Sequence, residues 1–218
     1  MKGLLIKDVM LMKNQKQFFI IVLMIGILFL FTNENPSGAI SYVMILSAMC
    51  TVNTMSYDEF NNGMGFLFTL PISRKTYVME KYVLGIISVF LFAVLITILT
   101  AVTDVMRQVP YSLQEYAIVM VIDFLLAVFV FSLQIPLKLK FRAEKSGIAM
   151  MAVFALAAVI GFAVVKIMQN MGINLEELFE KVDRISVGKV GIVCVMLALT
   201  VLFISYMISV RIMKNKEF

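Results

Sequence analysis

One carboxylate of this sequence, Asp123, lies well inside an apolar run. A charged side chain at the centre of a bilayer costs roughly 2.5–3.5 kcal/mol on insertion scales. Asp123 must therefore face a cavity, a helix interface or water near a membrane surface. Two interpretations follow: the carboxylate lines a translocation path and meets a cationic substrate, or it is a protonated or snorkelled acid about two helical turns from Glu115.

Two side-chain amides lie near the ends of other apolar runs. Asn53 is near the end of the run 39–57, and Gln134 is near the end of the run 116–137. Polar groups at such positions commonly form hydrogen bonds between helices in membranes. Contact with a transported substrate is the alternative. We therefore take Asn53, Asp123 and Gln134 as candidates to line a translocation path.

The residues that hydrolysis or metal binding would need are missing from the sequence. There is no histidine, which removes the commonest general base and metal ligand. Gly188-Lys189 is followed by Val190 and lacks the upstream glycine of a phosphate-binding loop. Lysine and arginine exceed aspartate and glutamate by only 19 to 14, too little to indicate a nucleic-acid partner. We expect no enzyme activity, no metal site and no cofactor in this chain.

Composition places the chain in a membrane. The sequence has 218 residues, of which 61% are hydrophobic, and its mean hydropathy is +0.98. Soluble domains are usually about 45–50% apolar. We therefore predict an all-α integral membrane protein in which residues 1–218 form one transmembrane domain.

Six apolar runs can be taken as membrane-spanning helices, for which about 20 residues are needed. They are 17–32, 39–57, 77–102, 116–137, 147–167 and 187–210. Gln134 and Pro136 are expected to end the fourth. With six crossings, 14 of the 19 lysines and arginines face one side, and the positive-inside rule makes that side, with both termini, cytoplasmic. The first run is short, and a re-entrant segment is the alternative, but two basic central loops would then face outward.

Two further segments are expected to lie on the membrane surfaces. Residues 1–16 carry four lysines around a rough apolar face, which is typical of an amphipathic helix in the inner interface. Residues 174–184 begin with Asn174, which can cap a helix together with Glu177. We predict that this second helix lies on the outer surface.

A short amphipathic segment separates the second and third spans. Its apolar stripe has helical spacing and consists of Phe60, Met64, Leu67 and Phe68. At about 12 residues, a helix at 59–70 is too short to cross a bilayer. Pro71 interrupts it, and Ser73 is a suitable N-cap for the following helix. The chain has no soluble domain to cover this stripe, so we expect it to dock on another protein, with the lipid interface as the alternative.

The sequence from Asp58 to Lys81 resembles the corresponding part of ABC-2 type transporter permeases. In that family an acidic residue after the second span precedes a short helix, a Leu-Pro-x-Ser-Arg run, here ending at Arg74, and a Lys-Tyr pair, here ending at Tyr82. The six-span layout extends the resemblance over the whole chain. Small size and the absence of a large outer domain most resemble the permease subunits of bacterial peptide exporters, such as the phenol-soluble modulin exporter.

The resemblance implies that helix 59–70 is a cytoplasmic coupling helix seated in a groove of a separate ATP-binding-cassette ATPase, which would hold the ATP and magnesium. The residues it assigns to coupling are Glu59, Phe60, Met64, Leu67, Phe68, Leu70, Pro71 and Arg74. The family works as two permeases with two ATPases. A second permease copy, identical or homologous, is therefore expected in the bacterial cytoplasmic membrane.

The function implied is export of amphipathic peptides, including antimicrobial or toxin peptides, across the membrane. Membrane lipid is expected to surround the helices. Eighteen methionines would make the cavity walls apolar and adaptable. Two alternatives remain. One is a non-transporting membrane protein that binds antimicrobial peptides and confers immunity. The other is a secondary transporter, which would need inverted repeats and paired ionisable groups at the midplane that we do not see in the sequence.

Overall fold

The computed structural model describes residues 2–32, 37–59, 63–108, 113–141, 143–170 and 187–216. Within these ranges the chain is helical almost throughout and contains no strand, which confirms the all-α prediction. The helices are α1 (Lys2–Asn14), α2 (Lys16–Thr32), α3 (Ser37–Glu59), α4 (Gly63–Leu67), α5 (Arg74–Arg107), α6 (Leu113–Lys140), α7 (Ala143–Asn170) and α9 (Val187–Lys214). Phe60 and the expected outer helix at 174–184 lie outside the described residues.

Five of the described helices, α3, α5, α6, α7 and α9, are long and apolar enough to cross a membrane. A sixth crossing requires α1 and α2 to act as one span, and these two helices meet at a bend of 64°. α2 has 17 residues, about 25 Å of helix, slightly less than the roughly 30 Å hydrocarbon core. The described chain therefore has five or six spans, and the crossing of residues 17–32 stays a prediction.

Helix α5 is longer at both ends than the predicted span 77–102. Its 34 residues correspond to about 50 Å, well beyond the roughly 30 Å of a hydrocarbon core. It must therefore project from the membrane at one or both ends. Its first residue, Arg74, follows the α4 segment closely.

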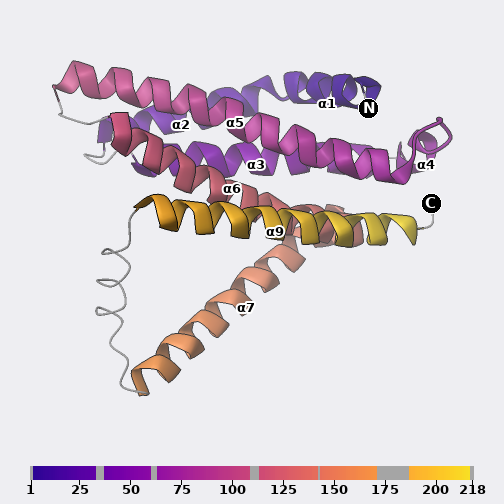
Figure 1. Ribbon diagram of the computed structural model, residues 1–218. Helices are drawn as coiled ribbons and strands as arrows, with labels where there is room; N and C mark the ends of the chain where they lie inside the picture. The colour runs from indigo at the N-terminus through magenta and orange to yellow at the C-terminus, as the bar shows by residue number, and fades with distance from the viewer. Residues whose placement is uncertain are drawn as a thin grey trace.

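The helices form a bundle from which one helix departs. Figure 1 shows α2, α3, α5, α6 and α9 lying side by side, with α4 and both chain ends at one end of the bundle. We call this the α4 end. α7 leaves the bundle at an angle and contacts chiefly α6 and α3. None of its most apolar part is buried within the chain, so its surface is available to lipid or to another protein.

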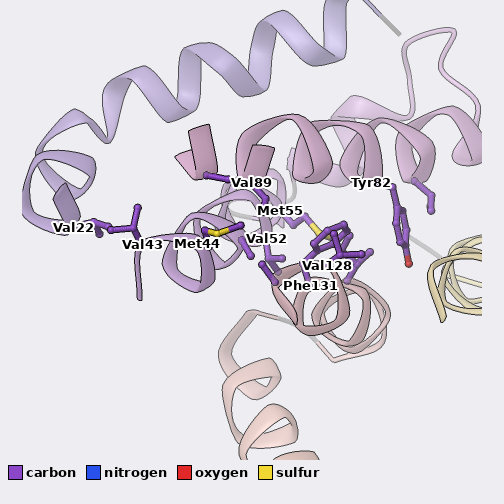
Figure 2. Close-up of a cluster of buried hydrophobic side chains, with 14 of the residues drawn as sticks. Val22, Val43, Met44, Val52, Met55, Tyr82, Val89, Val128 and Phe131 are labelled. Atoms are coloured by element: carbon purple, nitrogen blue, oxygen red, sulfur yellow. The ribbon is translucent and has the colours of Figure 1, made fainter. Parts of the chain in front are cut away.

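The apolar core lies where α2, α3, α5 and α6 meet, and Figure 2 shows part of it. Val43 and Met44 of α3, Val89 of α5 and Phe131 of α6 are fully buried there. Close approach of α2 to α3 depends on Gly26, because a Cβ at this position would lie 2.7 Å from Val43 Cγ2. Small residues at helix interfaces have this role in many membrane proteins.

Helix α6 does not end at Gln134 and Pro136, where the sequence suggests the end of the fourth span. Helix α6 continues through both residues to Lys140. Proline lacks the N–H that would bond the carbonyl four residues earlier, here that of Ser132. The structure supplies a substitute donor, because the Ser205 hydroxyl of α9 donates to Ser132 O. The continuation of the helix could not be seen in the sequence, because this donor lies 73 residues away along the chain.

This arrangement makes the cost of losing Ser205 depend on Pro136. We expect Ser205→Ala to destabilise the protein by about 1–2 kcal/mol, because it leaves the buried Ser132 carbonyl without a partner. In a Pro136→Ala background the N–H of residue 136 becomes available, and the same change should cost about half as much. Thermal unfolding of the single and double variants measures the difference.

Ser209 provides the matched control for this prediction. Its hydroxyl lies 2.9 Å from the Tyr82 hydroxyl, which also contacts Ser205. Ser209→Ala should therefore lower the free energy of unfolding by the same amount whether proline or alanine is present at position 136. An equal cost of Ser205→Ala in the two backgrounds would contradict the substitute hydrogen bond.

Candidate functional site at the α4 end

The segment between the second and third predicted spans begins with α4, which packs against the end of α3. Gly63 is required for this contact, because a Cβ there would lie 2.8 Å from the Asp58 backbone oxygen. Met64 and Leu67 are buried in the apolar core of the chain. The expectation that these two residues belong to an uncovered stripe is wrong, because the membrane helices themselves cover them. Met64 and Leu67 hold α4 on the bundle.

The opposite side of this segment carries exposed apolar side chains. Phe66 is 72% exposed and Leu70 is 45% exposed, and Pro71 is also exposed. We call Phe66, Leu70 and Pro71 the α4 surface. Leu70 and Pro71 were expected site residues, whereas Phe66 falls outside the helical stripe on which that expectation rested. Among the described residues, the most exposed large hydrophobic side chain of the α4 segment, Phe66, thus lies next to the predicted stripe.

The junction between α4 and α5 is held by a helix cap and a contact between two rings. Ser73 caps α5 as predicted, since its hydroxyl accepts a hydrogen bond from the Thr76 N–H at 3.1 Å. Phe68 is half-buried, and its ring lies edge-on to Tyr77 of α5 with the ring centroids 5.8 Å apart. Phe68 therefore connects the α4 segment to the first turn of α5.

Two of the expected coupling residues connect this segment to the end of α9. The Arg74 guanidinium donates to the carbonyl oxygens of Met213, at 3.2 Å, and Lys214. Carbonyls at the last turn of a helix lack partners within the helix, and a cation there also complements the helix dipole. Glu59 forms an ion pair with Lys216 at 2.8 Å. The end of α9 is thus tied both to α5 and to the end of α3.

A buried group of charges, which we call the ion cluster, joins α1 to α3 and α5. Its members are Lys7 and Asp8 of α1, Asp58 of α3, and Glu80 and Lys81 of α5. Asp8 and Glu80 are fully buried, and Lys81 is 1% exposed. Lys81 pairs with Asp8 and, at 2.8 Å, with Asp58. Lys7 pairs with Asp58 and, at 3.1 Å, with Asp8.

Hydroxyl groups add further hydrogen bonds to the ion cluster. The Tyr77 hydroxyl donates to Asp58 at 3.0 Å, and the Thr54 hydroxyl lies 3.2 Å from both Lys81 Nζ and Asp8 Oδ2. In the described part of the chain, these acidic side chains are not arranged to hold a metal ion. Because Tyr77 also packs on Phe68, the ion cluster and the α4 segment are in contact through one side chain.

Sequence reasoning did not identify this cluster. It counted Lys7 and Lys81 as topological signals, and it noted Asp58 and Lys81 only as parts of a motif. The available signal was Asp8, the one acidic residue among the lysines of the first 17 positions. An acid in an otherwise basic amphipathic helix requires a partner of opposite charge if that part of the helix is buried.

Asn53 and Gln134 line one cavity of about 270 Å³ between α3, α6 and α7. Asn53 Oδ1 accepts a hydrogen bond from Lys138 Nζ at 3.3 Å. A second cavity, of about 620 Å³ near the α1–α2 bend, shares Asn53 and Ser56 with the first. The structure therefore brings two of the three candidate path residues together, towards the α4 end.

Asp123 lies in a different part of the bundle. It is buried at the contact of α6 with α3, where it accepts a hydrogen bond from the Ser41 hydroxyl at 2.7 Å. Its second carboxylate oxygen has no hydrogen-bond partner among the described residues. Ser41 precedes Asn53 by 12 residues on α3, which corresponds to about 18 Å along the helix. Asp123 therefore does not share the cavity of Asn53 and Gln134.

Comparison with known proteins extends over nearly the whole chain. The model of the family described as ABC-2 family transporter protein matches residues 3–214. No curated protein matches the sequence.

Proposed function

Because the chain belongs to the ABC-2 family of transporter proteins, we propose that it is the permease subunit of an ATP-driven exporter in a bacterial cytoplasmic membrane. The match over residues 3–214 carries the proposal, since it covers almost all of the described helices. The sequence has no phosphate-binding loop, and in this proposal a separate ATPase subunit supplies the energy. Two permease copies, identical or homologous, work with two ATPase subunits in this proposal.

The α4 surface is our proposed contact with the ATPase. Phe66 and Leu70 are exposed at an end of the bundle, where flanking charges favour water over lipid. Exposed aromatic side chains of this kind are typical anchors of protein interfaces, since they fill pockets of the partner. The α4 end would then face the cytoplasm, in agreement with the excess of lysine and arginine there.

Contacts behind the α4 surface support a route from the ATPase to the membrane helices. Phe68 packs on Tyr77 of α5, and Arg74 and Glu59 hold the end of α9. The ion cluster adds α1 to the same unit through Lys81. In this proposal, closure of the ATPase subunits moves α4. Helices α1, α5 and α9 then move with it, because the hydrogen bonds, ion pairs and ring contacts described above join them directly.

We propose amphipathic peptides as the cargo. The cavity of about 620 Å³ near the α1–α2 bend presents the amides of Gln17 and Asn53 beside Phe18 and Tyr57, and a mixture of amides with aromatic rings suits ligands that have polar and apolar faces. Asp123 remains a candidate for a later position on the path. Transport would begin at the α4 end and release the peptide on the opposite side.

Transport in vesicles tests the proposal. The permease, purified with the ATPase that accompanies it, is reconstituted into lipid vesicles, and a fluorescent amphipathic peptide is added outside. We expect peptide to accumulate inside only when ATP is supplied, because inside-out complexes expose their ATPases to the medium. A non-hydrolysable ATP analogue is the control and should give no accumulation.

Other results would favour the other functions. Accumulation that does not require ATP would indicate a secondary transporter. Tight peptide binding with no accumulation, with or without ATP, would indicate an immunity protein. If a lipid-like amphiphile is transported in an ATP-dependent way but no peptide is, the chain is a permease subunit and the proposal of a peptide cargo is wrong.

A further inference from the structure

The cavity lined by Asn53 and Gln134 also contains a nearly buried lysine. Lys138 is 8% exposed and lies near the end of α6, two residues before that helix ends. Its ammonium group has three N–H donors and cannot accept a hydrogen bond. The one hydrogen bond that the described part of the chain provides is the bond to Asn53 Oδ1 at 3.3 Å. Two donors are therefore available to a further acceptor in the cavity.

Among the residues that the structure describes, the charge of Lys138 is only partly balanced. The carboxylate that acts on it electrostatically is Glu59, but Glu59 already forms an ion pair with Lys216 at 2.8 Å. A buried ammonium without a close counter-charge is costly. The cavity thus favours an anionic oxygen, such as that of a phosphate, close to Lys138 Nζ.

The surroundings of Lys138 match a molecule with a polar head and an apolar tail. Ser56 and Ser146 add hydroxyl groups to the cavity, whereas Met150 adds an apolar wall. Beyond the cavity, α7 leaves the bundle (Figure 1) and presents Ile148 and Met151, which are at least 70% exposed. An acyl chain could lie along this apolar helix face. The volume of about 270 Å³ is just below the roughly 300–1,000 Å³ of ligand pockets and fits a headgroup but not a whole lipid.

We propose that this cavity binds the phosphate headgroup of an anionic membrane lipid, with Lys138 as the charge partner and α7 as the support for an acyl chain. The site is separate from the α4 surface and from the ion cluster. It would hold one lipid per chain at the junction of α3, α6 and α7, where α7 has few contacts with the rest of the protein.

Native mass spectrometry of the full chain in mild detergent tests this proposal. The protein is mixed with phosphatidylglycerol and phosphatidylcholine of equal chain length, and retained lipids are counted. We expect one phosphatidylglycerol per chain, with about a tenfold preference over phosphatidylcholine. Lys138→Gln should remove the preference, and Lys138→Arg should keep most of it. Lys140→Gln is the matched control, because Lys140 is exposed on the same helix, and it should behave as the wild type.

A second variant keeps the test independent of any folding defect in Lys138→Gln. A Cβ at Gly147, which lines the cavity, would meet no atom within 4 Å apart from the adjacent backbone of its own helix. Gly147→Asp should therefore fold, neutralise Lys138 and remove the preference for phosphatidylglycerol.

Four results would overturn the lipid site, three of them in the lipid experiment. The first is equal retention of both lipids by the wild type. The second is an unchanged preference in Lys138→Gln and Gly147→Asp. The third is displacement of phosphatidylglycerol by inorganic phosphate alone, which would identify a soluble anion as the ligand. If a peptide carboxylate binds in a manner that depends on Lys138 while no lipid preference exists, the cavity is a cargo site and the proposal is wrong.

Discussion

Replacing Lys81 by methionine is expected to lower the unfolding temperature of the protein by about 10 °C or more. Lys81 is 1% exposed and pairs with two carboxylates, Asp8 and Asp58. Removing one partner of a buried ion pair typically costs about 3–5 kcal/mol, because the remaining charges stay buried without compensation. For a chain of this size each kcal/mol corresponds to roughly 2–4 °C. The fraction of protein that still elutes as one sharp peak after heating measures the effect.

Two variants on the same helix serve as controls. Lys75 is exposed, so Lys75→Met should change the free energy of unfolding by no more than about 0.5 kcal/mol. Glu80→Gln should also be tolerated, because the ion cluster contains three carboxylates and two ammonium groups, and this change removes the excess negative charge. If Lys81→Met and Lys75→Met unfold at the same temperature, the ion cluster does not stabilise the fold.

A double variant separates the contribution of the Lys81–Asp8 ion pair from the contributions of the two individual side chains. Asp8→Asn removes one of the carboxylates that Lys81→Met leaves uncompensated. The two changes together should therefore cost less than the sum of the single changes, as is usual for residues in direct contact. A strictly additive result would mean that α1 is not held by this pair.

Replacing Phe66 by aspartate is expected to abolish association with the ATPase, with at least a tenfold loss, while the membrane fold stays intact. Phe66 is 72% exposed, compared with 45% for Leu70, and a buried aromatic anchor commonly contributes about 2 kcal/mol or more to an interface. This chain has no phosphate-binding loop. ATP hydrolysis in the material purified through an affinity tag on this chain therefore measures the bound partner.

The choice of Phe66 avoids a confounding effect on folding. Phe68 lies in the predicted stripe but is half-buried against Tyr77, so a charge at position 68 would destabilise the start of α5 as well. Phe66→Leu keeps an apolar side chain and should retain most of the co-purified hydrolysis. If Phe66→Asp retains the full hydrolysis, the ATPase binds elsewhere and the α4 surface faces lipid or solvent.

Several features could be predicted from the sequence because each depends on a short stretch of chain. The long apolar runs predict helices, since a backbone in lipid must satisfy its own hydrogen bonds. Ser73 was identified as an N-cap because a cap uses only the neighbouring residues, and the bond to Thr76 confirms it. The family resemblance rested on a local motif between Asp58 and Lys81, and the family match confirms it.

Other features could not be predicted because each depends on contacts between distant parts of the chain. A stripe that includes Met64 and Leu67 shows that one helix face is apolar, but it does not show what covers that face. In the structure, other helices of the same chain cover Met64 and Leu67. In the sequence, Lys81 is only a positive charge near a membrane boundary. In the structure, Lys81 contacts Asp8, which lies 73 residues earlier. The sequence alone thus determined the helices and the family, through local periodicity and a motif. Only the tertiary structure decided which polar and apolar side chains are in contact, because these contacts depend on how separate helices pack.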